Sequence, residues 1–197
     1  MSQQWIYVII FVLCLIVSAF FSTSETAFTS SSMIRLKTAK DQGNTGARIA
    51  INILDQFDNL LSAILIGNNF VNILASSVAT LFFVNLNAQY GATVATAVST
   101  VLVLMFAEIT PKQIARIAPE KIAVGVAPLL RIAKIILSPF VWLFDQWQKL
   151  VSRFVRVEST TGISEQELKT YVDEARRGGG IEHSEHRLIH TAIEFDD

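Results

Sequence analysis

The sequence predicts an all-α membrane protein with three transmembrane helices, an interfacial juxtamembrane helix and a small cytosolic helical module. Of its 197 residues, 51% are hydrophobic and only 17% are charged, whereas about 25% are charged in an ordinary soluble domain. Residues 111–156 carry eight Lys/Arg and two Asp/Glu, while residues 157–197 carry four and ten. A basic collar followed by an acidic segment indicates a membrane domain over residues 1–156 and a solvated helical bundle over residues 157–197.

Three stretches are long enough to cross a bilayer, which takes about 20 helical residues at about 1.5 Å each. The first is the uncharged run 5–21, which continues as a helix into STSETAF. The second is 60–86, an apolar stretch interrupted by three asparagines, and the third is 91–110, which is apolar until Glu108. Residues 41–46 are expected to form a turn between two short helices in the loop after the first span. Residues 87–90 form the loop between the second and third spans.

The loop charges predict the orientation in the membrane. The segment between the first two spans carries four basic residues, the 87–90 loop carries no charge, and the stretch after the third span is basic again. Because basic loops stay on the cytoplasmic side, we expect the amino terminus outside and the carboxy terminus in the cytoplasm. The expected location is the inner (plasma) membrane, with the lipid bilayer as partner. With no basic stripe clear of the hydrophobic part, nucleic acid is not an expected partner.

Residues 122–157 are apolar enough to form a fourth span, but polar residues recur along them every three to four positions. These are Arg131, Lys134, Ser138, Asp145, Gln148 and Ser152. One polar stripe on an apolar helix is typical of a segment lying in the membrane interface. We favour that interpretation over a crossing because two basic residues at mid-span would be costly, and we expect a kink at Pro139.

The acidic tail predicts two short amphipathic helices. Ser164 and Glu167 form a capping box that opens the first helix, and glycines 178–180 end it. In the second helix four apolar residues are expected to point inward, namely Leu188, Ile189, Ala192 and Ile193. Helices this short are marginal alone, so we expect them to pack on another subunit or on a following domain.

Polar residues of the three spans gather at one level of the membrane. Glu25 lies near the inner end of the first span with Ser22 one turn before it; Asn68 and Asn72, four residues apart, share one face of the second span. Glu108 reaches the same depth on the third span, just before Pro111, which withholds a backbone donor. Ionisable residues at membrane depth indicate a functional site. Snorkelling carboxylates and asparagines acting as interhelical packing contacts are the alternatives.

The predicted ligands Ser22, Glu25, Asn68, Asn72 and Glu108 offer only oxygen atoms. Such a set suits a hard cation such as Mg²⁺, Ca²⁺ or Na⁺ and not zinc or copper. His183, His186 and His190 share a face of the tail helix, and we interpret them as a solvated surface, with metal binding as the minor alternative. No catalytic or cofactor-binding constellation is present in the sequence, so we expect no enzyme.

Three motif stretches carry a family resemblance: FFSTSETAFTSS (20–31), LIGNNFVNILASS (65–77) and AEITPKQIA (107–115). They resemble the transmembrane domain of the CorB/CorC family, the prokaryotic relatives of the CNNM magnesium transporters. The resemblance places the five predicted ligands on the family's polar intramembrane positions. It also places Pro111-Lys112 on the family's Pro-Lys step. Ala107 differs from the family pattern, in which a glycine often precedes the glutamate. It implies a homodimer, and a C-terminal CBS-domain pair that would follow the tail.

The resemblance implies Na⁺-coupled export of Mg²⁺ through an inward-facing, oxygen-lined site. Mg²⁺ would be the transported substrate, with Na⁺ as a possible second ion; the choice of Mg²⁺ over Ca²⁺ follows from the resemblance, since oxygen ligands alone do not decide it. Two rival functions are a Mg²⁺ channel and a membrane-anchored regulatory scaffold without transport. Ion flux through proteoliposomes would distinguish all three.

Overall fold

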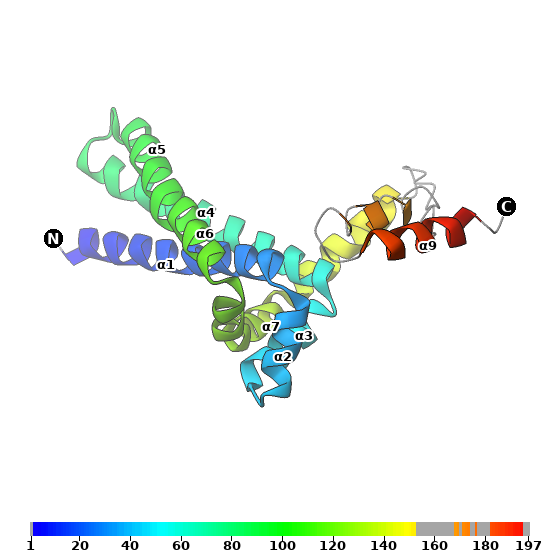
Figure 1. The fold of residues 1–197 in the computed structure, drawn as a ribbon. Coiled ribbons are helices and arrows are strands. Elements are labelled where there is room, and N and C mark those ends of the chain that lie inside the picture. Colours follow the sequence, from blue (N-terminus) through cyan, green and yellow to red (C-terminus); the bar gives the residue numbers. More distant parts are fainter. Residues whose placement is uncertain (1, 153–167, 170, 174–175, 177–181, 195–197) are drawn as a thin grey trace. The chain divides into compact units, whose positions relative to one another are not determined.

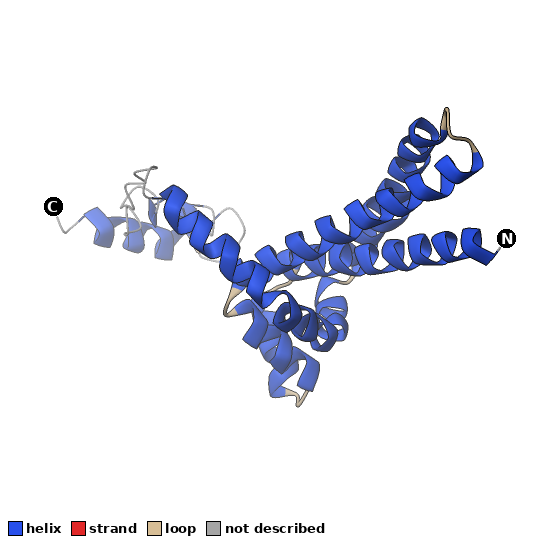
Figure 2. Ribbon diagram, turned by 180° about the vertical axis from the view of Figure 1, so that it is seen from behind, coloured by secondary structure: helices blue, strands red, loops and turns tan. Residues whose placement is uncertain are grey.

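The fold is known from a computed structural model that describes residues 2–152, 168–169, 171–173, 176 and 182–194. Every regular element among these residues is a helix (Figure 1, Figure 2). The chain divides into two compact units, residues 1–150 and 151–197. The expected domain boundary after residue 156 lies outside the described residues and stays a prediction. In chain order the helices are α1 (Ser2–Ser30), α2 (Met33–Asp41), α3 (Thr45–Leu54), α4 (Phe57–Leu86), α5 (Gly91–Leu102), η1 (Val103–Ile109), α6 (Thr110–Ile117), α7 (Pro119–Ser152) and α9 (His183–Glu194).

In the part of the chain that the structure describes, four stretches of helix are long and apolar enough to cross a membrane, which confirms the all-α membrane fold. They are Gln4–Ser30, Phe57–Leu86, Gly91–Ile117 and Pro119–Val151. The sequence predicts three spans, and the additional candidate is α7. It is continuous through Pro128 and Pro139 and reaches 34 residues, since each proline removes only one backbone donor. Length and composition do not distinguish a crossing helix from one lying in the interface.

The first unit is a bundle in which α1 packs on α4, η1 and α6, and α4 packs on α5. The amino terminus and the 87–90 turn lie toward one end of the bundle, while α2, α3 and the start of α7 gather at the other (Figure 1, Figure 2). In neither view does α7 run back alongside α1 and α4. This arrangement agrees with α7 lying at one membrane surface, which remains a prediction.

The buried core lies where α1 meets the short helices. Side chains of α1, α2, α3, α4 and α7 form one apolar cluster there, which includes Phe28, Leu36 and Leu130. Gly67 of α4 faces α1 so closely that an added Cβ would lie 2.5 Å from the ring of Phe21. The absence of a side chain at Gly67 therefore permits the close approach of α1 and α4. Farther along, α1, α4 and α5 expose many large apolar side chains, as lipid-facing helices do.

The turn at 41–46 joins α2 and α3 into the expected helical hairpin. Gly43 has a φ of +87°, a conformation that a residue with a Cβ rarely adopts. The Asn44 side chain then accepts a hydrogen bond from the backbone N–H of Ala47 at 3.1 Å and caps α3.

Two polar contacts attach α7 to this hairpin region. Glu120, in the first turn of α7, accepts a hydrogen bond from the backbone N–H of Ser32 at 3.3 Å and pairs with Arg35 at 3.5 Å. About four turns farther along α7, Lys134 donates to the amide oxygen of Gln56 at 2.7 Å. Lys134 of the polar stripe therefore faces protein, not lipid.

The second unit contains α9 and parts of the segment 168–176. In α9, Leu188 is 71% exposed and Ile189 is 37% exposed, so the expectation that both point inward is wrong. The helix turns His186 inward instead, and its side chain is only 12% exposed. A hydrogen bond between His186 and Asp173, together with the charges of His186 and His190 when protonated, holds the pKa of Asp173 below its ordinary value. The capping box at Ser164 and the glycines 178–180 lie outside the described residues.

Candidate functional site

A hydroxyl group of α1 joins the two asparagines of α4. The Ser18 side chain is buried, and its Oγ lies 2.7 Å from Oδ1 of both Asn68 and Asn72. A serine hydroxyl carries a single hydrogen, so it donates to one of these oxygens at a time. The contact confirms that Asn68 and Asn72 share one helix face, and it places three oxygen-bearing side chains at one point in the membrane-spanning part of the bundle.

Ser22 lies one turn farther along the same face of α1. Its side chain is fully buried, and its Oγ has no hydrogen-bond partner among the described residues. Ser24, equally buried, donates to the backbone oxygen of Phe20 at 2.8 Å. A buried hydroxyl without a partner costs about 1–3 kcal/mol. Such an atom is a candidate ligand for an ion or for a buried water.

Glu25 and Glu108 are held by a lysine. The Lys112 Nζ lies 3.2 Å from Oε2 of Glu25 and 3.6 Å from Oε1 of Glu108, and the three side chains are 28–37% exposed. Glu25 comes from α1, while Glu108 and Lys112 are four residues apart on the third span. The ammonium group neutralises one of the two negative charges, so a single net negative charge remains for another cation.

The third span has a widened turn where it carries Glu108. Residues 103–109 form a π-helix, and the N–H of Thr110 bonds to the carbonyl of Met105, five residues back. Pro111 follows at the start of α6 and has no N–H to donate. Such π-helical turns occur frequently at functional sites. Pro111 was expected to leave one backbone carbonyl without its donor. The structure shows a longer irregularity before it, the π-helix over residues 103–109.

The polar groups form a track along one face of α1. Ser18, Ser22 and Glu25 are spaced by four and three residues, which on a helix spans about 10 Å on one side. Neutral oxygens meet at the Ser18 end and charged groups at the Glu25 end. Short-range contacts therefore bring together Asn68 with Asn72, and Glu25 with Glu108. Ser22 lies between these two groups.

Two residues of this arrangement were missed as site candidates from the sequence. Ser18 is the only serine or threonine in residues 5–21, four residues before Ser22, and that spacing was the available signal. Lys112 was noted only as part of the Pro-Lys step. Its position four residues after Glu108 is the standard spacing of a helical ion pair.

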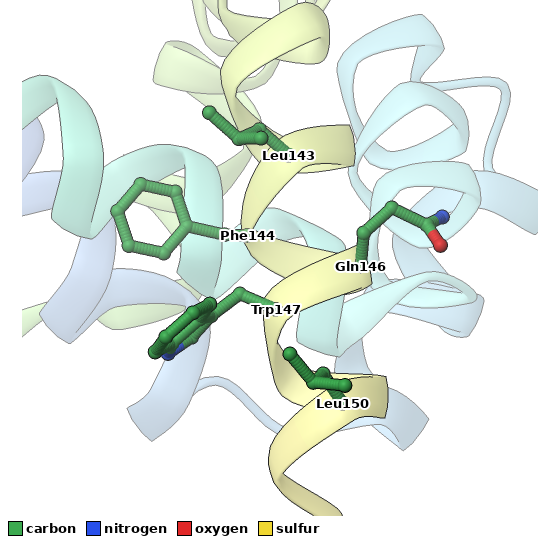
Figure 3. Close-up of a pocket in the computed structure, with 5 residues that line it drawn as sticks. All are labelled: Leu143, Phe144, Gln146, Trp147 and Leu150. Atoms are coloured by element: carbon green, nitrogen blue, oxygen red, sulfur yellow. The ribbon is translucent and has the colours of Figure 1, made fainter.

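Two hollows differ in what they could bind. A groove of about 380 Å³ on α4 is lined by Asn69, Asn72, Ile73, Ser76, Ser77 and Thr80. Asn72 therefore contacts Ser18 on one side and borders an open polar groove on the other. A hollow on α7 is formed by Leu143, Phe144, Gln146, Trp147 and Leu150 (Figure 3). Its walls are apolar except for Gln146, which offers a single amide oxygen, so the hollow suits lipid better than a cation.

Comparison with known proteins places this chain in a family. Residues 9–185 match the family described as the cyclin M transmembrane N-terminal domain. The chain belongs to this family. It is 38% identical over 164 residues to the UPF0053 inner membrane protein YfjD of Escherichia coli, covering 81% of this chain and 38% of that protein.

Two further relatives show the same pattern of coverage. A UPF0053 protein of Haemophilus influenzae is 39% identical over 170 residues, covering 85% of this chain and 40% of that protein. The polyamine export protein of Escherichia coli is 28% identical over 204 residues, covering 95% of this chain and 46% of that protein. The chain therefore spans less than half the length of these curated relatives. The resemblance inferred from the three motif stretches is confirmed at the level of the family.

Proposed function

We propose that this chain is the membrane part of a cation transporter whose cargo is Mg²⁺, and that it catalyses no chemical reaction. Ser22, Asn68 and Asn72 supply neutral oxygens to the ion, and Glu25 and Glu108 supply the negative charge that attracts it. Oxygen ligands without Cys or thioether groups suit Mg²⁺. The single observation that carries the proposal is the buried, unpartnered Oγ of Ser22.

The proposed transport is Na⁺-coupled export from an inward-facing site, with the carboxy terminus in the cytoplasm of a bacterial inner membrane. Mg²⁺ loses water reluctantly, so it reaches the neutral cluster partly hydrated and bound to several fixed oxygens. Lys112 provides a mechanism for release. When its ammonium pairs with Glu25 and Glu108, it competes with the cargo for the same carboxylates. A homodimer would supply the second wall of the pathway, since closed two-fold dimers are the commonest assemblies.

The test compares two serines of α1. In calorimetric titration of the purified chain in detergent, Ser22→Ala is expected to lower Mg²⁺ affinity about tenfold, which corresponds to about 1.4 kcal/mol. Ser24→Ala is the matched control, because it removes an equally buried hydroxyl that its own helix already satisfies. It is expected to bind Mg²⁺ like the wild type.

Two outcomes would contradict the proposal. Unchanged Mg²⁺ affinity in Ser22→Ala would remove this hydroxyl from the site. An equal loss in both variants would show that the packing of α1, and not ligation by Ser22, determines binding.

A second candidate cargo is a polyamine, as the name of one relative states for that protein. The favouring observation is that Glu25 and Glu108 already hold an ammonium group, that of Lys112. An alkylammonium could take its place between the carboxylates. The same titration with spermidine separates the two cargoes. Spermidine would bind through the carboxylates, so its affinity would not change in Ser22→Ala, whereas the affinity for Mg²⁺ would fall.

A further inference from the structure

Three side chains that can ligate a metal converge in the second unit, outside the polar track of the bundle. Asp173 belongs to the segment preceding α9, and His186 and His190 are one turn apart on α9. One ligand atom from each residue lies within 4.8 Å of the others. Nε2 of His186 and of His190 lie 2.5 Å and 3.5 Å from the same carboxylate oxygen, Oδ1 of Asp173.

The side chains of His186 and His190 are more buried than those of a solvated surface. The side chains of His186 and His190 are 12% and 28% exposed, and Nε2 of His190 is buried without a hydrogen-bond partner in the described part of the chain. The two imidazole rings lie 4.8 Å apart between centroids. At that distance two protonated rings would repel each other. Two neutral rings would instead direct their Nε2 lone pairs at a metal ion bound beside the carboxylate; without an ion, the ring nitrogen of His186 donates its N–H to Asp173.

These separations are close to those of a tetrahedral metal site. Ligands at about 2.0–2.2 Å from a zinc ion lie about 3.4 Å from one another. The His190–Asp173 separation already matches this value at 3.5 Å. On metal binding the His186–Asp173 separation of 2.5 Å would lengthen by about 1 Å, and the longest separation among the three ligand atoms, at most 4.8 Å, would shorten toward about 3.4 Å. Three protein ligands leave the fourth position of the metal to water.

The ligand chemistry decides the class of ion. Imidazole nitrogen suits Zn²⁺, Co²⁺, Ni²⁺ and Cu²⁺, whereas Mg²⁺ and Ca²⁺ select oxygen. A site with two imidazoles and one carboxylate therefore discriminates against the ion that we propose as cargo. We propose that Asp173, His186 and His190 bind one divalent transition-metal ion, Zn²⁺ by preference, which ties α9 to the segment before it. The proposal does not depend on the function of the membrane part.

A structural consequence follows from the length of the helices. α9 has 12 residues, and a helix of that length is marginal in water alone. Its apolar residue Leu188 is exposed, so little apolar burial holds it. Small modules with little buried core are commonly stabilised by a metal. Zn²⁺ binding should therefore slow backbone hydrogen exchange in α9.

The experiment uses the full chain purified in detergent and stripped with a chelator. Zn²⁺ titration followed by calorimetry is expected to show one ion per chain, still bound when Mg²⁺ is in large excess. Asp173→Asn and His190→Ala are each expected to weaken Zn²⁺ binding at least about tenfold. His183→Ala is the matched control, because His183 is an exposed histidine of the same helix and lies outside the three-residue cluster.

Asp173→Asn guards against a folding artefact, since it keeps the shape of the side chain and an oxygen that accepts from His186. With Zn²⁺, hydrogen exchange in α9 should slow in the wild type and in His183→Ala, and not in Asp173→Asn. The proposal is overturned if the wild type binds no Zn²⁺ in excess Mg²⁺. It is also overturned if Asp173→Asn binds Zn²⁺ like the wild type, or if His183→Ala loses as much affinity as His190→Ala.

Discussion

Ser22 and Ser24 are two residues apart on α1, and both are buried, yet within the part of the chain that the structure describes only Ser24 has a hydrogen-bond partner. In a helix a serine hydroxyl ordinarily bonds to a carbonyl one turn back, as Ser24 does to Phe20. A hydroxyl that leaves this bond unmade is free to ligate an ion. The proposed site therefore rests on the unmade hydrogen bond of Ser22, and not on the number of polar residues in the spans.

Lys112 provides the second prediction at this scale. Lys112→Met keeps most of the apolar stem and removes the charge that sits 3.2 Å from Glu25 and 3.6 Å from Glu108. Without its competing ammonium the two carboxylates should attract Mg²⁺ more strongly, and we expect affinity to rise at least about threefold by calorimetric titration. Without Mg²⁺ the variant should melt at a lower temperature, because two carboxylates then lack a counter-ion.

Lys121→Met is the control for Lys112→Met, because it removes a positive charge from an exposed position of α7. Its Mg²⁺ affinity should match that of the wild type. Weaker Mg²⁺ binding in Lys112→Met would show that the lysine supports the cation site instead of competing with it, and the release mechanism proposed above would be wrong.

At the scale of the helices, the hydrophobic pattern predicts where the spans lie but not their internal geometry. A run of apolar residues favours any helix that satisfies its backbone in lipid, so residues 91–110 were expected to be helical. Nothing in that run distinguishes an α-helix from the π-helix at 103–109. α1 packs against η1 and α6, which lie far from it in sequence, and a local pattern cannot show such contacts.

The placement of α7 in the membrane gives a prediction at this scale. The stripe residue Lys134 bonds to Gln56, and Glu120 attaches the start of α7 to α2; both contacts hold the helix against the α2–α3 end of the bundle. We therefore expect α7 to lie in the interface, with α9 on the same side of the membrane as α2 and α3. A cysteine at the exposed position Ser184 should resist an impermeant thiol reagent in intact cells and react after permeabilisation.

The matched reporter is Gln89→Cys in the loop between α4 and α5, both variants being built on Cys14→Ala to remove the native thiol. This exposed loop should react in intact cells, since it is expected outside. Reaction of Ser184→Cys in intact cells would show that α7 crosses the membrane, and would raise the number of spans to four.

At the scale of the whole molecule, the class of fold followed from the sequence because apolar runs and loop charges are local signals. The common orientation of Asn68 and Asn72 also followed, because residues four apart lie on the same face of a helix. The roles of Ser18 and Lys112 did not, because each depends on which faces of α1, α4 and α6 meet. The inward turn of His186 was missed for the same reason: its partner Asp173 lies in another segment, and the periodicity of α9 alone favoured Leu188.

The whole-molecule proposal is that these helices carry Mg²⁺ across a bilayer, and flux through proteoliposomes tests it most directly. Mg²⁺ movement should depend on an opposing Na⁺ gradient, and Asn72→Ala should reduce it at least about tenfold, because the amide oxygen contacts Ser18 and borders the open groove. Ser77→Ala is the control, since Ser77 borders the same groove while its hydroxyl bonds to the backbone of Ile73. Flux without a Na⁺ gradient would indicate a channel. Absence of Mg²⁺ flux from the wild type, or wild-type flux in Asn72→Ala, would contradict the cation site proposed between α1 and α4.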